Sequence, residues 1–374
     1  MSTPNRRYRW RLLDWHHTPH PAGFQARDWP LQPDRRAALR ASSGFEADFA
    51  TRGEWEQILH VMHFVHGLSA HQGWVEAESR DAFHLLEGAR SGHITYRCVE
   101  FAWMLHHLLT AWAIPSRVVG LLRATSEAGL GQGHVVVEAW CNRWGKWVVL
   151  DPQFDRWYQS RAGMVLSALD VHDRVVAGHF EDIVDSRRAA LAESYTPMDA
   201  QDNQIYDRID VPDGFERDEV WASLPERSDF ESFLRHWLGY YRRLTFAPAT
   251  DLSGLPRRAV PTLLLHDPGD TPPAVFQRSA VVYHCTTDRH ALYAPFNGVD
   301  LMLVPEAPDR LRIQLRCAMP WFDHYRVEVD GHIGRTRRHH LRLRLHRGSN
   351  RVRVAAVNDQ ERSGPPSSFT LDVG

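Results

Sequence analysis

The chain has 374 residues, of which 43% are hydrophobic and 24% charged, and its formal net charge is -2 at pH 7. This length allows two or three domains, and the composition is ordinary for a globular protein. The near-neutral charge argues against general polyanion binding as the main role of the chain.

The beginning of the chain predicts no membrane or secretory targeting. Residues 1–50 are rich in Arg, His, Pro and Trp without a sustained period, so we expect an N-terminal extension that holds at most a strand near 8–13. The first residues are polar and no apolar run follows them, and no stretch of about eighteen apolar residues occurs anywhere. We therefore expect a cytoplasmic protein that does not span a membrane.

Two amphipathic segments predict helices within a core over residues 51–195. From Glu54, apolar residues recur at helical spacing, and Gly67 is a stop signal near the end. A second helix is predicted from Cys98 to about Trp112. Pro115 then ends it, because the residue before a proline is pushed out of the α region.

Strand-like runs follow the second helix. They cover 117–122, 134–140 and 146–151, and residues 142–145 between the last two are typical of a hairpin loop. A helix followed by an antiparallel meander predicts the α+β class.

The remainder of the chain predicts a connecting region and a second domain. Residues 196–295 are expected to be mostly helical or irregular, with a helix at 229–243, a proline-rich linker at 247–273 and a strand at 280–284. Before this region, a further helix is expected within the core at 166–176. Residues 296–374 show short alternating runs such as 341–345 and 351–357, which predict a small β-sandwich.

Arginines are concentrated in the last domain. The pattern admits a nucleic-acid or acidic-polymer surface, but alternation with apolar residues already explains it as a solvated strand face, which we favour. The residues concerned are Arg335, Arg337, Arg338, Arg342, Arg344, Arg347, Arg351 and Arg353.

Cys98 has the position of a reactive thiol. The start of a helix gathers unpaired N–H groups and the positive end of the helix dipole, which favour a thiolate and can stabilise an oxyanion. Glu100 works against that field, so we expect it to turn away or to pair with an arginine. The alternative is a buried structural thiol, which is how we interpret Cys141, Cys285 and Cys317. The four cysteines form no CxxC pair, so a zinc ribbon is not expected.

A nucleophilic cysteine needs a base and a group that orients the base. His134 opens one predicted strand of the hairpin and Asp151 closes the other. An even-numbered loop over 142–145 places Val136 opposite Asp151, so that His134 lies diagonal to Asp151 on the same face. An odd register would put the two on opposite faces.

Four blocks of sequence make a specific resemblance. They are 96–102 (YRCVEFA), 113–120 (AIPSRVVG), 133–140 (GHVVVEAW) and 146–152 (KWVVLDP). In order, spacing and flanking residues they resemble the cysteine, histidine and aspartate motifs of the transglutaminase-like superfamily. The C-terminal residues 350–367 are similar to the last strands of fibronectin type III-like domains.

The resemblance implies a papain-like core that transfers an acyl group from an amide through a thioester. Cys98 would be the nucleophile, His134 the base and Asp151 its orienting partner, with Gln72 and Trp74 as candidate oxyanion donors. Water as acceptor gives a protease or amidase, and an amine gives a transferase; the sequence does not decide between them. We expect a peptide or protein amide substrate, no cofactor, no metal and no nucleic acid, and leave the oligomeric state open. The alternative is an inactive binding or scaffold protein on the same fold.

Overall fold

The computed structural model describes most of the chain in two compact units. We call Ala26–Cys141 with Trp147–Arg289 the mixed unit, and Met1–Gln25 with Asn142–Lys146 and His290–Gly374 the sandwich unit. The described residues are 10–16, 32–45, 47–69, 77–122, 133–186, 235, 237–246, 262–265, 283–293 and 297–374.

Helix α4 is the most buried helix of the mixed unit. Every residue from Glu100 to Ala111 is buried, in keeping with a helix that is apolar nearly all round. α2 buries the narrower stripe that its spacing predicts, including Ile58, Met62 and Val65. The helices that the structure describes in this unit are α1 (Pro33–Ser43), α2 (Glu54–His66), α3 (Ala82–Arg90), α4 (Cys98–Ala111) and α5 (Ala168–Ala177), with 3-10 turns η1 (Ala47–Thr51), η2 (Phe180–Asp182) and η3 (Gly239–Arg242).

One sheet runs through the mixed unit in the order β6-β5-β4-β3-β2-β7-β8-β9. β2 pairs antiparallel with both β3 and β7, whereas β8 and β9 run parallel. The mixture of helices with a mainly antiparallel sheet confirms the predicted α+β class. Its strands are β2 (Ser116–Leu122), β3 (Gly133–Cys141), β4 (Lys146–Asp151), β5 (Arg156–Ser160), β6 (Ile183–Asp185), β7 (Arg243–Phe246), β8 (Thr262–Leu265) and β9 (Tyr283–Thr286).

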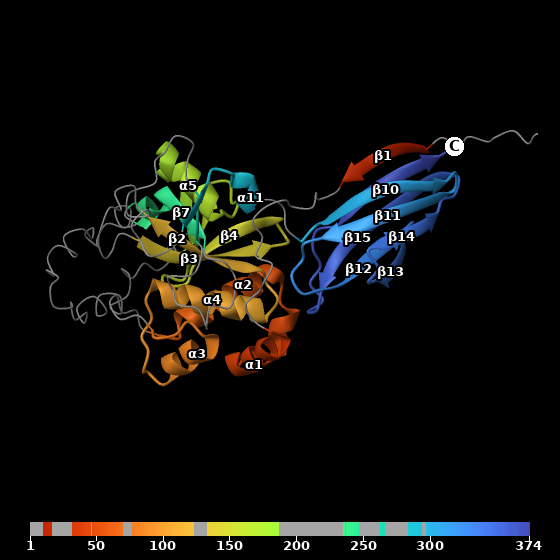
Figure 1. Ribbon diagram of the computed structural model, residues 1–374. Helices are drawn as coiled ribbons and strands as arrows, with labels where there is room; N and C mark the ends of the chain where they lie inside the picture. The colour runs from red at the N-terminus through yellow and green to blue at the C-terminus, as the bar shows by residue number, and fades with distance from the viewer. Residues whose placement is uncertain are drawn as a thin grey trace, which may run out of the picture. The chain divides into compact units, whose positions relative to one another are not determined.

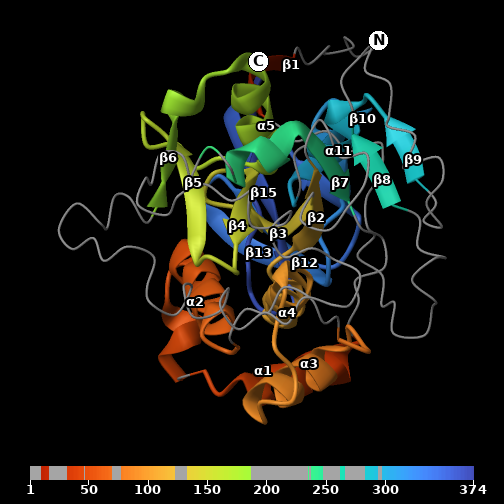
Figure 2. The same cartoon turned by 90° about the vertical axis from the view of Figure 1, so that its left-hand side faces the viewer.

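The helices are layered on the two sides of this sheet. α4 contacts β3 and β2, and α2 contacts β3, whereas α5 contacts β7 and η3. Figures 1 and 2 show α2 and α4 on one side of the central strands and α5 on the other. The layering holds α4 directly against β3, the strand that carries His134.

The described parts of the connecting region differ from the sequence prediction at three places. Residues 229–234 and 236 of the helix predicted at 229–243 lie outside the described residues. Within the described part, the chain is helical at 235, 237 and 238, the 3-10 turn η3 follows, and Arg243 opens β7 and pairs with Leu122 of β2. In the predicted linker at 247–273, only residues 262–265 are described, and they form strand β8. Residues 280–282 of the strand predicted at 280–284 lie outside the described residues, and the described β9 covers Tyr283–Thr286. These short strands extend the sheet of the core, so tertiary pairing decides their structure and local spacing does not.

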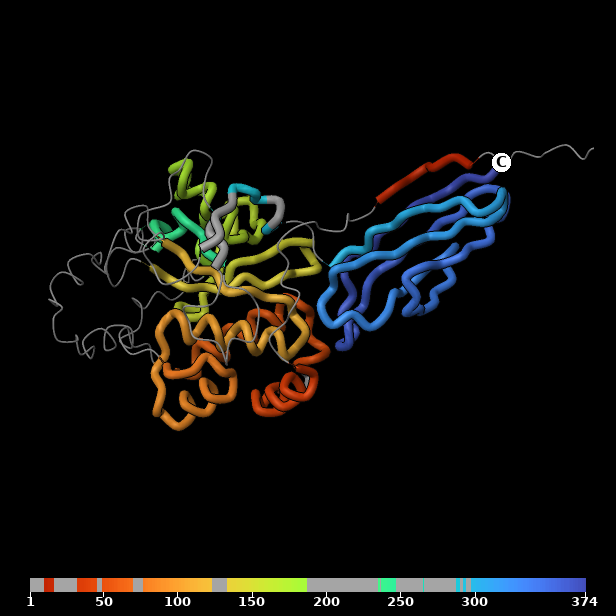
Figure 3. The backbone as a smooth tube through the Cα atoms, in the orientation of Figure 1, coloured from red at the N-terminus to blue at the C-terminus, as the bar shows by residue number. Residues whose placement is uncertain are grey.

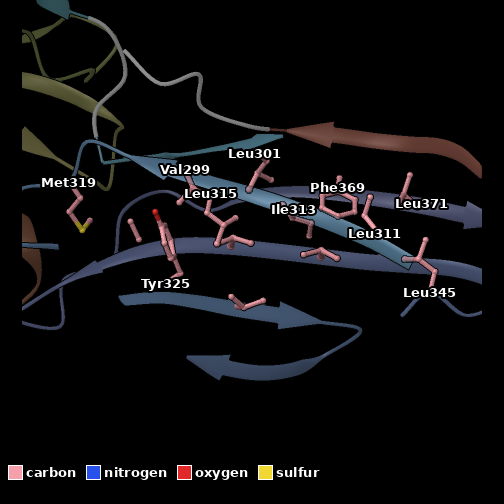
Figure 4. Packing of buried hydrophobic residues seen from close by; sticks show 14 of the residues in the cluster. Val299, Leu301, Leu311, Ile313, Leu315, Met319, Tyr325, Leu345, Phe369 and Leu371 are labelled. Atoms are coloured by element: carbon pink, nitrogen blue, oxygen red, sulfur yellow. The ribbon is translucent and has the colours of Figure 1, made fainter. Parts of the chain in front are cut away.

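The sandwich unit contains two facing antiparallel sheets, β10-β11-β14 and β1-β16-β15-β12-β13. Alternate residues of β11, such as Leu311, Ile313 and Leu315, are buried, and they share one core with Phe369 and Leu371 of β16. Figure 4 shows these side chains between the strands. The predicted C-terminal β-sandwich is therefore present. Its strands are β10 (Val299–Ala307), β11 (Arg310–Cys317), β12 (Phe322–Val329), β13 (His332–Thr336), β14 (His340–Arg344), β15 (Gly348–Asn358) and β16 (Ser367–Val373).

The N-terminal segment adds a strand to this sandwich. β1 (Trp10–His16) pairs antiparallel with β16, and Figure 3 shows the red strand β1 alongside the blue strands of the sandwich. Trp15 packs on Phe369, with ring centroids 6.1 Å apart. Residues 1–50, predicted as one extension, are thus divided between the units: β1 joins the sandwich, and α1 joins the mixed unit.

Among the described residues, no helix is both long enough and apolar enough to cross a bilayer.

Candidate active site

Cys98 is the first residue of α4, as predicted. The first helical hydrogen bond runs from Phe101 N to Arg97 O at 3.1 Å. The N–H groups of Cys98, Val99 and Glu100 therefore have no acceptor within the helix. Cys98 is half-buried, so its sulfur lies at the positive end of a helix dipole without being closed off from solvent.

Glu100 pairs with an arginine, as expected. It accepts hydrogen bonds from Arg97 Nε and Nη2 at 3.1 and 3.0 Å and from the N–H of Arg97 at 3.1 Å. The N–H of Ala77 also donates to it at 3.2 Å. These four donors compensate a carboxylate that is only 1% exposed, so its charge does not oppose a thiolate at position 98 as a bare carboxylate would.

His134 and Asp151 meet, as the hairpin register requires. His134 Nε2 donates to Asp151 Oδ2 at 2.8 Å, and the two residues are only 3% and 2% exposed. β3 ends at Cys141 and β4 begins at Lys146, which leaves the predicted four-residue loop. Because Nε2 is used by Asp151, Nδ1 is the ring nitrogen that is open to Cys98.

The electrostatics of His134 link all three residues. Burial, the largest influence, lowers the pKa of this imidazole. The charge and hydrogen bond of Asp151, followed by a hydrogen bond and charge from Cys98, outweigh burial and raise the pKa of His134 to about 10. His134 is therefore protonated at neutral pH, and its two N–H groups face a carboxylate on one side and a sulfur on the other.

Aromatic rings surround the imidazole. The ring centroids of Trp237, Phe154 and Tyr240 lie 5.0, 5.7 and 6.4 Å from that of His134. Trp237 also stacks on Tyr240 at 5.3 Å. These contacts exclude water from the His134–Asp151 pair, which strengthens its attraction. Sequence reasoning missed the rings; the aromatic density of 237–241 (WLGYY) was the available signal.

A buried ion pair lies behind Asp151. Arg156 is the direct cross-strand partner of Asp151 in the β4–β5 ladder. Arg156 is 1% exposed, and its Nη1 lies 3.2 Å from Asp185 Oδ2. Burial lowers the pKa of Arg156, but Asp185, Tyr158 and Asp151 together raise it above its ordinary value, so the guanidinium stays charged. The sequence prediction did not include this pair, because nothing local connects β5 with β6.

The other predicted site residues have separate positions. Gln72 and Trp74, the candidate oxyanion donors, lie outside the described residues. Cys141 is buried, and Cys317 is half-buried in the sandwich unit. In the part of the chain that the structure describes, one group of possible metal ligands lies close together, namely His179, Glu181 and Asp182, and all three are exposed.

Comparison with known proteins gives little. No protein-family model matches the chain, and no curated protein matches it. Among solved structures, it is similar to fibronectin(III)-like modules of CbhA from Clostridium thermocellum, at 20% identity over 19% of this chain and 88% of that chain, with a TM-score of 0.16. A TM-score this low supports no inference about fold or function. The resemblance to the transglutaminase-like superfamily stays a prediction from the motifs.

Proposed function

We propose that this protein is a cysteine-dependent acyl-transfer enzyme that acts on amide bonds through a thioester. The observation that carries the proposal is the connected set of Cys98, His134 and Asp151, in which a buried 2.8 Å hydrogen bond orients the imidazole and the imidazole interacts with the sulfur. This is the arrangement that an activated cysteine nucleophile needs.

The proposed reaction uses each residue in turn. The Cys98 thiolate attacks the amide carbonyl carbon, and the N–H groups at the start of α4 stabilise the oxyanion. When the C–N bond breaks, the imidazolium of His134 gives its proton to the leaving nitrogen, and a thioester remains on Cys98. Water or an amine then attacks the thioester while His134 takes up a proton, which restores the thiolate and releases the acid or the new amide.

The proposed fold assignment follows from the same elements. A helix that begins with the nucleophile and packs on an antiparallel strand bearing the histidine is the papain-like arrangement of the transglutaminase-like superfamily. We propose that the mixed unit belongs to that group and that the sandwich is fibronectin type III-like. The motif blocks support the first assignment, and the 3+4 pairing of strands β10 to β16, to which β1 is added, supports the second.

The competing function is an inactive protein that keeps the fold as a scaffold. A scaffold does not need a protonated histidine beside a half-exposed sulfur, whereas a thiol enzyme needs both. Alkylation distinguishes the two functions without a known substrate.

The test is limiting iodoacetamide on the native protein near neutral pH, with mass spectrometry of each cysteine peptide. We expect Cys98 to be modified at least about ten-fold faster than Cys141, because an imidazolium neighbour favours the thiolate and Cys141 is buried. His134→Ala should slow only Cys98. Cys98→Ala should then abolish turnover of peptide amides, assayed with and without an added amine. Equal modification of the native cysteines, or a Cys98 rate untouched by His134→Ala, contradicts the proposal.

A further inference from the structure

The sandwich unit contains a pocket lined by several side chains that carry hydrogen-bond donors, together with the apolar Leu315. Its volume is about 450 Å³, and it lies on the sheet β10-β11-β14. No Asp or Glu is among the lining residues, whose polar members are Arg312, Gln314, Arg316, Cys317, His339 and His340. A pocket with this lining suits an anionic ligand.

The strand register explains why cations gather here. Arg312 and Arg316 of β11 alternate with the buried core residues, so they share the outer face of the sheet. Across the ladder to β14, Arg312 faces Arg342 and Gln314 faces His340. Like charges that face each other directly destabilise a sheet unless an anion lies between them.

One end of this face already has its anion. The carboxylate of Glu306 forms ion pairs with Arg312 Nε at 3.4 Å and with Arg342 Nε at 3.3 Å, and so bridges two facing arginines. Glu306 shows that a carboxylate can contact arginine side chains of β11 and β14 at the same time.

The other end, at Arg316 and His340, lies at the pocket. Arg316 makes no ion pair with any residue that the structure describes, and the carboxylate opposite it on β10, Asp300, does not line the pocket. His340 is exposed, and His339 hydrogen-bonds the hydroxyl of Tyr325 at 3.2 Å. Burial raises the pKa of Cys317, so the thiol stays neutral and does not oppose an anion.

The spacing of these groups selects the kind of ligand. Arg312 and Arg316 are four residues apart on one strand, about 13 Å between Cα atoms at the usual strand rise. That span is too long for one small anion, but residues i and i+4 of an extended peptide have the same separation. Guanidinium groups also bind carboxylates in a bidentate manner, which favours a carboxylate ligand.

We propose that this pocket binds an acidic polypeptide segment in extended form, with carboxylates on alternate residues that pair with Arg316 and with the free donors of Arg312. The site is independent of the proposed acyl-transfer activity. An acidic single-stranded nucleic acid is the alternative ligand, and the experiment below separates the two.

The test uses the full chain and the fluorescein-labelled peptide Glu-Thr-Glu-Thr-Glu, with Gln-Thr-Gln-Thr-Gln as its neutral counterpart. Fluorescence anisotropy near physiological salt should show binding of the Glu peptide alone. Arg316→Gln should weaken it about five-fold, the effect of one exposed charge contact of about 1 kcal/mol. The matched control is Arg335→Gln, which removes the same charge from β13 on the other sheet, where Arg335 is 62% exposed.

Circular dichroism should show that both variants are folded, since both arginines are exposed. A loss of affinity in Arg316→Gln but not in Arg335→Gln supports the site. Equal effects of the two variants would mean diffuse charge attraction and overturn it. Oligothymidylate that binds more tightly than the peptide and loses affinity in Arg316→Gln would assign the pocket to nucleic acid and overturn the peptide proposal.

Discussion

Replacing Asp151 with Asn tests the electrostatic core of the proposed site. The substitution keeps the size of the side chain but removes the negative charge 2.8 Å from His134 Nε2. It also replaces a pure acceptor by a group that can present either an oxygen or an NH₂ to the ring. The imidazole therefore loses its main reason to remain protonated.

The expected magnitude follows from the pKa of His134. In the wild type this pKa is raised from 6.5 to about 10, which corresponds to about 5 kcal/mol in favour of the imidazolium. Without Asp151, burial dominates and the pKa should fall to about 6.5 or below. At pH 7.5 the protonated fraction then drops from nearly complete to about one tenth. The ring also loses its orientation, which should lower the turnover rate by a further factor of about a hundred. Together the two effects should lower turnover about a thousand-fold.

The same shift predicts a pH dependence of stability. A group whose pKa is higher in the folded than in the unfolded chain stabilises fully below the unfolded value. The contribution of His134 should thus be complete below about pH 6.5, decline above it and vanish as the pH passes about 10. Asp151→Asn should remove this slope from the melting temperature measured across that range.

The direct assay is NMR of protein labelled at the histidine ring nitrogens, with the His134 signal assigned by its absence in His134→Gln. Its midpoint should lie near pH 10 in the wild type and at least about three units lower in Asp151→Asn. The iodoacetamide rate of Cys98 at pH 7.5 should fall about ten-fold in parallel. A midpoint within half a unit of the wild type in the variant would refute the assignment of Asp151 as the group that controls His134.

Two further predictions concern stability. Arg156→Met leaves the buried Asp185 without its cation and should lower the free energy of unfolding, measured by urea denaturation, by about 3–5 kcal/mol. The double variant Arg156→Met/Asp185→Asn should lose less than the sum of the two single losses. Strict additivity would mean that the two residues are not coupled. Gly364→Ala should cost about 3 kcal/mol, because the new Cβ overlaps the backbone oxygen of Asn297, whereas Gly334→Ala, with open space around its Cβ position, should change little.

Residue spacing and turn residues predicted those elements whose structure depends mainly on neighbouring residues in the sequence. The stripe of α2, the start of α4 at Cys98 and the loop of four residues between β3 and β4 all follow from spacing and turn residues. The short strands β7, β8 and β9 did not, since each has four residues and depends on a neighbour far away in the sequence. The pairing of β1 with β16 joins residues more than three hundred positions apart, and no local pattern indicates it.

The candidate site divides in the same way. Cys98 was predicted from the start of a helix and the motif order. His134 and Asp151 were predicted to meet because the two-residue strand period puts their side chains on one face of the hairpin. The groups around them were not, because Trp237 and Asp185 reach the site from elements that have no sequence relation to the hairpin. The sequence predicted that Glu100 would pair with an arginine, because its charge would otherwise oppose a thiolate nearby. It did not predict which arginine, and the structure shows that it is Arg97.

The order of charges gives the strongest physical reason to prefer an enzyme over a scaffold. In the order in which they neighbour one another, Asp185, Arg156, Asp151 and His134 alternate in sign, and each is nearly fully buried. Burying such a series costs more than an apolar core of the same volume, so stability alone does not account for it. The series ends at Cys98, the one member that is partly exposed, where a thiolate would continue the alternation. Under the proposed function, the series places the imidazolium of His134 beside the sulfur that attacks the substrate.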